Sequence, residues 1–340
     1  MGGTVNENVK RTLVIGAGAI GGTLGALLAR AGHEVVFLTR SGETAEAINR
    51  DGMTVRGVRG TFAARARAAH QADRLAPPFD LVMVAVKTYD LQAALAPALG
   101  LIAEGCPVVS LQNGICIEEL EALVGADRAV GCAVGWGATM QGPAVMELTS
   151  EGELVIGCRS AVGQARLPAV SQVLAPAFPV KISSDILADL YSKLIINSCI
   201  TTLGAISGRT LGWMLARRAY RARFIDIMRE GMAAARAAGI RVPPYAGRLD
   251  YDAFLRGDAP LDGVRRHLFI RMMGLKYRRL KSSSLQSLER GRRTEVDSFN
   301  GYIVKTARAH GLSAPLNERL VRMVHEIEAG TRVISPSNFS

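Results

Sequence analysis

The sequence predicts an α/β domain with a parallel sheet, followed by an all-helical domain. Its 340 residues suggest two domains of ordinary size. In the first half, short apolar runs alternate with segments of helical period, whereas from about Ser184 onward the apolar period is near 3.6 and strand-like runs disappear. We therefore expect an α/β domain over residues 1–183 and a helical domain over residues 184–340.

Composition and cysteine usage are those of an ordinary globular protein. Apolar residues make up 49% of the chain and charged residues 21%, which excludes disordered and fibrous classes. The five cysteines are scattered, without a CxxC pair or metal-type spacing, so we expect reduced thiols and no metal site. The opening MGGTVNENVKR lacks the apolar core of a secretory signal. The uncharged stretch 12–29 is long enough for a membrane span, but it contains five glycines that a glycine-rich turn explains better. We therefore expect a cytoplasmic protein with no membrane contact.

A glycine-rich turn opens the first domain. The apolar run 12–15 is followed by a loop and then by leucines at helical spacing, and a second strand is expected over 34–38. In such a unit the first glycine permits a tight turn, the second lets the backbone approach a pyrophosphate, and the third lets helix and strand pack closely. The loop therefore predicts dinucleotide binding by Gly16, Ala17, Gly18, Ala19, Ile20 and Gly21.

The residue at the end of the second strand selects between the two nicotinamide cofactors. NAD-binding units place Asp or Glu there, to accept a hydrogen bond from the ribose 2′-hydroxyl. This chain has Thr39, Arg40 and Ser41, which suit a 2′-phosphate. We expect NADP(H), with Arg40 as a contact, while recognising that Arg40 could be an ordinary surface arginine.

Two further strands are followed by polar turns. The apolar run 81–86 precedes Lys87, and the run 108–111 precedes Asn113. Ligands bind at the carboxyl edge of an open α/β sheet, so both side chains are site candidates, although Asn-Gly is also a common turn dipeptide. Beyond Val130, the runs 146–148 and 154–157 predict antiparallel strands that end the sheet.

A polar stripe interrupts the first helix of the second domain. The helix expected over 186–203 is apolar on most of its circumference, which marks it as buried. Lys193, Asn197 and Thr201 recur every four residues and so share one face. Burying such groups is costly unless they meet a ligand or each other. Burial would also lower the pKa of a lysine, so that Lys193 could give a proton to a carbonyl oxygen that becomes negative during hydride transfer.

A last candidate lies before a C-terminal helix whose buried face is predicted to contain Val296, Phe299, Ile303 and Ala307. Thr294 and Asp297 are spaced as a capping pair, which places Glu295 in the first helical turn. Capping accounts for Asp297 and leaves Glu295 free for another role. A surface acid that compensates the helix dipole is the alternative.

The basic excess of the chain is local. Of a formal charge of +11, most lies in residues 265–293, which hold ten Lys or Arg and one acid, Glu289. A solvated helix face is one interpretation. Another is a positive rim beside a site for anionic ligands. Nucleic-acid binding is disfavoured, because no aromatic residues are interleaved as in known modules.

Together these residues resemble the ketopantoate reductase (2-dehydropantoate 2-reductase) family over about residues 10–330. The resemblance rests on the glycine loop, Arg40, Lys87, the segment around Asn113, residues 192–197, and the segment 293–297 with Asn300-Gly301. It implies a Rossmann-type domain and a helical domain like that of 6-phosphogluconate-type dehydrogenases, with the active site in the cleft between them. The implied reaction is NADPH-dependent reduction of ketopantoate to pantoate, on the route to pantothenate and coenzyme A.

The resemblance also implies roles for single residues. Lys193 corresponds to the general acid, Asn113 to a residue near nicotinamide and substrate, Asn197 to a substrate-binding asparagine, and Ser283 to the serine that holds the substrate carboxylate. Glu295 corresponds to a glutamate near substrate and cofactor, and Ala138 to a backbone contact with NADPH. The partner is then a small 2-oxo acid, and a homodimer is compatible with the sequence.

Two departures from the family pattern concern the substrate. Family members commonly carry a second asparagine and a proline where this chain has Thr201 and Thr202, and the segment 242–282 is longer and basic. A different 2-oxo acid, or an imine as in opine-type dehydrogenases, is the alternative reaction. A non-catalytic NADP(H) sensor that binds nucleic acid through residues 265–293 is the alternative outside enzymes.

Overall fold

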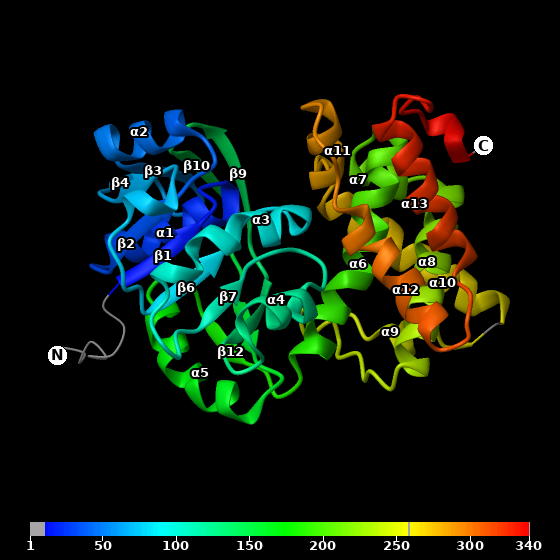
Figure 1. Cartoon of the computed structure of the whole chain (residues 1–340). Helices are drawn as coiled ribbons and strands as arrows, with labels where there is room; N and C mark the ends of the chain where they lie inside the picture. Colours follow the sequence, from blue (N-terminus) through cyan, green and yellow to red (C-terminus); the bar gives the residue numbers. More distant parts are fainter. Residues whose placement is uncertain (1–10, 258, 340) are drawn as a thin grey trace. The chain divides into compact units, whose positions relative to one another are not determined.

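The computed structural model describes residues 11–257 and 259–339, and the chain divides into two compact units between Leu187 and Ala188 (Figure 1). The division falls four residues beyond the boundary that we predict from the sequence. The first unit is α/β and the second is helical, as expected.

An eight-stranded sheet forms the centre of the first unit. Its order is β12-β11-β8-β7-β6-β1-β2-β5, and all neighbouring strands are parallel except β11, which runs antiparallel to β8. The strand at 154–157 is antiparallel to β8 as predicted, but the prediction that it ends the sheet is wrong, because β12 pairs with its other side and forms the edge. The strands are β1 (Arg11–Ile15), β2 (Glu34–Leu38), β5 (Arg67–Ala69), β6 (Leu81–Val84), β7 (Val108–Ser110), β8 (Ala129–Val134), β11 (Leu154–Gly157) and β12 (Val180–Ile182).

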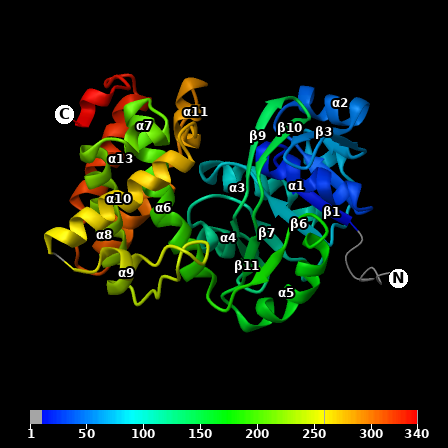
Figure 2. The same ribbon diagram turned by 180° about the vertical axis from the view of Figure 1, so that it is seen from behind.

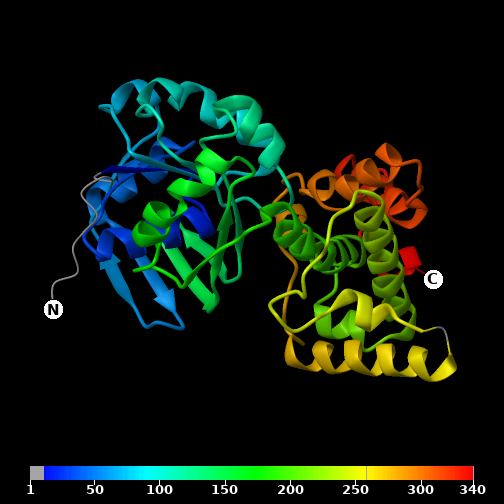
Figure 3. The same cartoon turned by 90° about the horizontal axis from the view of Figure 1, so that it is seen from below.

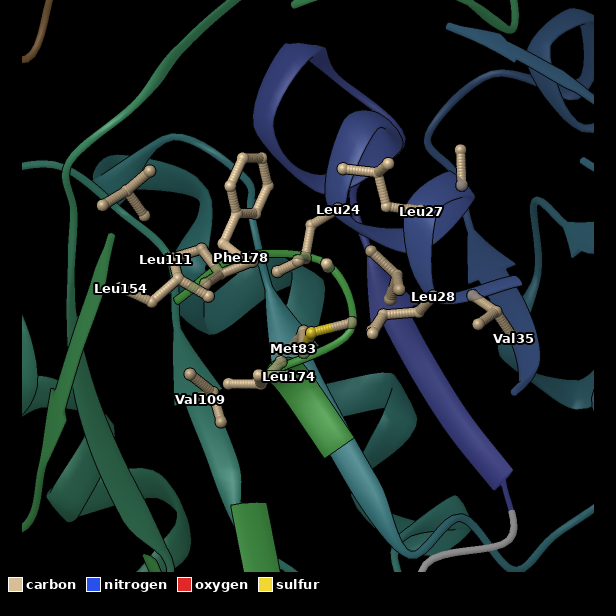
Figure 4. Close-up of a cluster of buried hydrophobic side chains, with 14 of the residues drawn as sticks. Leu24, Leu27, Leu28, Val35, Met83, Val109, Leu111, Leu154, Leu174 and Phe178 are labelled. Atoms are coloured by element: carbon tan, nitrogen blue, oxygen red, sulfur yellow. The ribbon is translucent and has the colours of Figure 1, made fainter. Parts of the chain in front are cut away.

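Helices cover both faces of this sheet, which explains why its strands are continuous apolar runs. Alternate residues of β1 enter different cores: Val14 lies in the core with α1 (Ala19–Arg30) and α5 (Ala161–Leu174), and Leu13 in the core with α3 (Leu91–Leu95) and α4 (Ile117–Val124). Figure 4 shows part of the first core, in which leucines of α1 lie near Met83. Figure 2 shows β11 and α5 from behind.

A second, four-stranded sheet was not expected. Its order is β4-β3-β10-β9, formed by β3 (Met53–Gly57), β4 (Phe62–Ala64), β9 (Gly137–Gly142) and β10 (Val145–Ser150). The prediction that the strand at 146–148 ends the main sheet is therefore wrong. Met146 and Leu148 are buried and Glu147 is half-buried, so the alternation identifies a strand but not the sheet to which it belongs. The side chain of Met146 packs on α1 at Gly22.

The second unit is built around α6 (Ile186–Ser207). The surrounding helices are α7 (Leu211–Leu215), α8 (Arg218–Ala237), α9 (Tyr251–Leu255), α10 (Pro260–Lys276), α11 (Ser283–Glu289), α12 (Asn300–Ala309) and α13 (Pro315–Glu328), and no strand is assigned among residues 188–257 and 259–339 (Figure 3). By length and hydropathy α6 could cross a membrane, but 67% of its most apolar window is buried inside the structure, as in the core helix of a soluble protein.

Candidate functional site

The glycine loop has the local geometry that its sequence predicts. Gly16 has φ +101°, a left-handed conformation, and its amide donates to Leu38 O at 2.9 Å. A Cβ on Gly21 would lie 2.2 Å from Gly16 O, so only glycine lets α1 approach β1 here. A Cβ on Gly18 would meet nothing within 4 Å, and α1 begins there without a side-chain cap or an acid in its first turn. The start of α1 therefore leaves open space beside uncapped N–H groups, as a phosphate requires.

Arg40 lies at the end of β2, next to this loop. Its guanidinium is 3.6 Å from Asp90 Oδ2, and its side chain is 79% exposed. Such a long and exposed ion pair contributes little to stability, so Arg40 can turn to another anion at small cost. The neighbouring Ser41 caps α2 (Gly42–Asp51) by accepting a hydrogen bond from Thr44 N.

Lys87 and Asn113 follow adjacent parallel strands, and the structure brings them to the same edge of the sheet. Strands β6 and β7 neighbour each other beside β1, so their carboxyl ends meet where the glycine loop begins. Both side chains are half-buried. The switch point of the sheet lies here, because β1 has β2 as its neighbour on one side and β6 on the other.

Gln112 fixes the two loops to each other, a role that sequence reasoning missed. It is buried, and its Nε2 donates to Val86 O at 3.1 Å, beside Lys87. Its Oε1 accepts from Ser110 Oγ at 3.0 Å and from Cys116 Sγ at 3.2 Å. A glutamine between an apolar strand and an Asn-Gly turn is the only sequence signal for this contact.

Ala138 lies in β9, on the second sheet. It is half-buried, pairs with Leu148 of β10, and packs against the core that contains α1. Strand β9 contacts α1. The predicted backbone contact between Ala138 and the cofactor stays a proposal.

The polar stripe of α6 forms as predicted. Lys193 and Asn197 are half-buried and Thr201 is buried, along a helix that is otherwise apolar. Ser192 holds the segment before Lys193, because its Oγ donates to Pro243 O at 2.8 Å and its carbonyl accepts from Tyr251 Oη at 2.7 Å. Burial raises the pKa of Tyr251 well above its usual value, so this phenol remains a hydrogen-bond donor at neutral pH.

Thr201 and α11 meet on the same part of α6. Thr201 Oγ1 donates to Asn197 O at 2.7 Å, so its hydroxyl hydrogen is used within the helix. Ser282 Oγ donates to Thr201 O at 3.2 Å and accepts from Leu285 N, capping α11. The next residue, Ser283, is exposed in the first turn of α11. The structure therefore places Ser283 one residue from a contact with the stripe.

Glu295 is buried, but its local structure differs from the prediction. A 3₁₀ turn over Val296–Ser298 follows it, and α12 begins only at Asn300. Thr294 Oγ1 accepts from Val296 N, two residues on, whereas Asp297 Oδ1 lies 3.0 Å from His325 Nε2. Thr294 and Asp297 are thus not a capping pair, and Glu295 is not in a helical turn. The predicted apolar face of this segment is buried, as expected.

A buried polar network connects α12 to the middle of α6, and sequence reasoning assigned it no role. Asn300 is fully buried, and its Oδ1 accepts a hydrogen bond from Thr202 Oγ1. Its Nδ2 donates to Ser198 O at 3.4 Å and to Asn317 Oδ1 at 2.8 Å. Asn317 in turn donates to Glu230 of α8. Asn300, five residues after Glu295, therefore holds its own segment against α6. One of its partners there is Ser198, the residue after Asn197.

The basic stretch is not uniformly solvated. Arg266 is buried and donates to three carbonyls at the end of α9, those of Leu255, Arg256 and Gly257. The neighbouring Arg265 is exposed and donates to carbonyls of the same segment. At least these two cations have structural roles, which a count of charges along the sequence cannot reveal. Among the described residues, no group of three or more His, Cys, Asp or Glu is placed to hold a metal.

A parallel sheet with a glycine loop at its switch point, joined to a helical unit with a lysine-bearing polar face, defines a dinucleotide-dependent reductase. Comparison with known proteins agrees. Residues 12–161 match the family "Ketopantoate reductase PanE/ApbA", and residues 185–328 match its C-terminal domain. The chain belongs to the ketopantoate reductase family, and it is an oxidoreductase that acts on CH–OH groups.

Three similar proteins cover nearly all of the chain. The 2-dehydropantoate 2-reductase of Pyrococcus abyssi is 29% identical over 93% of this chain and 97% of its own. The crystal structure of a PanE/ApbA family ketopantoate reductase from Ralstonia eutropha JMP134 is 30% identical, with a TM-score of 0.80 over 94% of this chain and 99% of that one. A D-mandelate dehydrogenase in complex with NADH and anilino(oxo)acetate has the same TM-score over 94% and 98% but is 21% identical, a likeness of fold alone.

Proposed function

We propose that the chain reduces a 2-oxo acid with NADPH, that the acid is 2-dehydropantoate (ketopantoate), and that the product, pantoate, serves pantothenate and coenzyme A synthesis. The observation that carries the proposal is the polar stripe of α6. A lysine and an asparagine share one face of a mostly buried helix, in a chain whose family reduces ketopantoate.

The first unit fits the cofactor. The space beside Gly18 accommodates the pyrophosphate, and the uncapped start of α1 provides N–H donors for it. NADP(H) rather than NAD(H) is proposed because Arg40 lies two residues beyond the end of β2, where an acid would favour the 2′-hydroxyl. When bound, NADPH supplies the hydride that reduces the carbonyl carbon.

The second unit supplies the proton and holds the acid. Lys193 stabilises the negative charge that develops on the carbonyl oxygen and gives it a proton, which yields the hydroxyl of the product. Asn197 and Ser283 are proposed to bind the substrate, with Glu295 near its hydroxyl and Thr201 as a further contact. Asn113 and Lys87, at the sheet edge of the first unit, are proposed to contact the nicotinamide end.

The test is a comparison of kcat/KM for ketopantoate with that for phenylglyoxylate and 2-oxoglutarate, each with NADPH and with NADH. Ketopantoate with NADPH is expected to give the highest value. A charge-assisted contact from Arg40 corresponds to roughly a 10–100-fold preference. Arg40→Asp should remove that preference, and Arg65→Asp, at an exposed arginine of the same unit, should not. Equal turnover with NADH would contradict the cofactor assignment, and faster reduction of phenylglyoxylate would contradict the substrate.

A further inference from the structure

The loop between α8 and α9, residues 238–250, and the start of α9 are joined to α6 at the residue before Lys193. Ser192 Oγ donates to Pro243 O at 2.8 Å, and Ser192 O accepts from Tyr251 Oη at 2.7 Å. Ser192 and Tyr251 are both buried. Figures 1 and 2 show this loop beside the first half of α6. Two hydrogen bonds therefore hold one residue of α6, and the next residue along the helix is Lys193.

The hydroxyl of Tyr251 lies against the backbone of this turn. In a regular α-helix the carbonyl of residue 192 accepts from the amide of residue 196. Burial raises the pKa of Tyr251 well above its usual value, and hydrogen bonds with Ser192 and with the amide of Ile196 act against this rise. An amide lowers the pKa of a phenol by donating to its oxygen, which favours the phenolate. Tyr251 Oη therefore contacts both backbone groups that join the turn containing Lys193.

The ring of Tyr251 lies along the face of α6 that is next to the polar stripe. Ser192 and Cys199 are seven residues, or two turns, apart and so share this face. Cys199 is fully buried and close enough to Tyr251 to add to the rise of its pKa that burial causes. Since one residue turns the helix by about 100°, Lys193 is on the neighbouring face. A rotation of α6 that redirects Lys193 would break both hydrogen bonds of Ser192.

The segment that holds Ser192 is itself well ordered by hydrogen bonds. Tyr245 N donates to Leu249 O at 2.9 Å, and Leu249 N donates back to Tyr245 O at 3.2 Å. Asp250 caps α9 by accepting from Ala253 N at 3.0 Å. Tyr251 is the first residue of α9, so this cap fixes its backbone. The loop and its tyrosine are therefore a firm support for α6.

We propose that Tyr251 is a positioning residue for the reaction, which holds the turn of α6 so that the Lys193 ammonium group reaches the carbonyl oxygen of the substrate. The inference rests on the proposed function, since it takes Lys193 as the proton donor. A displacement of about 1 Å can lower a catalysed rate about 100-fold. Tyr251→Phe retains the ring and the bond from Ser192 to Pro243, so we expect a smaller, roughly tenfold fall in the rate.

The test is the single-turnover rate of ketopantoate reduction at saturating NADPH for Tyr251→Phe, for Lys193→Ala and for the double variant. Tyr251→Phe should lower the rate roughly tenfold and leave the affinity for NADPH unchanged. In the double variant the loss of the phenol should lower the rate no further, because Tyr251 acts through Lys193. A merely structural role would lower the rate by the same factor in both backgrounds. Ser192→Ala, which removes the bond to Pro243, should show the same dependence on Lys193.

Tyr220→Phe is the matched control. Tyr220 is also buried, and its Oη also donates to a backbone carbonyl, that of Pro336 at 3.3 Å, which is not part of α6. This variant should retain the wild-type rate. A full rate for Tyr251→Phe, or an equal fall in the Lys193→Ala background, would overturn the positioning role alone. A full rate for Lys193→Ala would contradict the proposed function, and the positioning role with it.

Discussion

Replacing Asn300 by alanine tests whether the buried network between α6 and α12 stabilises the helical unit. Asn300 is fully buried, and both polar atoms of its side chain have partners. The substitution removes the acceptor of the Thr202 hydroxyl and the donor to Asn317 Oδ1. Thr202 can turn to the carbonyl of Ser198, one turn earlier on α6, which recovers part of the loss.

Each buried group left without a partner costs about 1–3 kcal/mol. With the partial recovery by Thr202, we expect Asn300→Ala to lower the free energy of unfolding of the second unit by about 2–4 kcal/mol. For a unit of this size that corresponds to a decrease in Tm of roughly 5–15 °C. Because Asn300 also holds the segment that follows Glu295, kcat/KM should fall at least tenfold at temperatures where the variant is folded.

Differential scanning calorimetry is the appropriate assay, because two units can unfold in separate transitions. The matched control is Asn49→Ala in the first unit. Asn49 also makes two hydrogen bonds, both with Ala68, but they are exposed to solvent. The control should cost under about 1 kcal/mol. If Asn300→Ala and Asn49→Ala lower the free energy of unfolding of their units equally, the buried network of Asn300 does not stabilise the helical unit as the structure implies.

Gly21→Ala should destabilise the first unit by about 1–3 kcal/mol in urea denaturation, since its Cβ would lie 2.2 Å from Gly16 O. Gly18→Ala should leave that stability unchanged and weaken NADPH binding in a fluorescence titration, because the new methyl enters open space. Burial raises the pKa of Cys106 from 9.0 to about 12, so the unfolded state loses this proton first and stability should fall above pH 9, by about 1.4 kcal/mol per pH unit. Urea denaturation at pH 8 and pH 10 measures this fall in stability. The fall should be smaller for Cys106→Ala than for the wild type, and an equal fall in both proteins would contradict the prediction.

Much of the fold could be predicted because local pattern and tertiary packing agree. The continuous apolar runs of β1 and β6 arise from burial on both sheet faces, and the change of period near Ser184 coincides with the start of the helical unit. The second sheet could not be predicted. Its strands β3 and β10 are parallel neighbours that lie about 90 residues apart in sequence, and alternation within β10 carries no information about its partner.

In the candidate site, too, local patterns could be predicted and contacts between distant segments could not. Residues whose chemistry is unusual for their surroundings, such as Lys193 on an apolar helix, are visible in the sequence. The capping pattern at Thr294 failed because Asp297 pairs with His325, a contact between segments that spacing does not report. Gln112 and Asn300 were not assigned roles because their hydrogen-bond partners come from other elements. Spacing along one element predicts a shared face, and only the folded chain shows what meets that face.

Lys193 is proposed to give the proton during reduction of a 2-oxo acid, and the rate of a single turnover without this side chain measures that role. Single-turnover reduction of ketopantoate is followed at saturating NADPH for the wild type and for Lys193→Ala, with the binding of NADPH measured separately. General acid catalysis contributes about 10²–10⁴-fold, so the rate should fall by that factor while the affinity for NADPH is unchanged. If Lys193→Ala retains the full rate, Lys193 is not the proton donor.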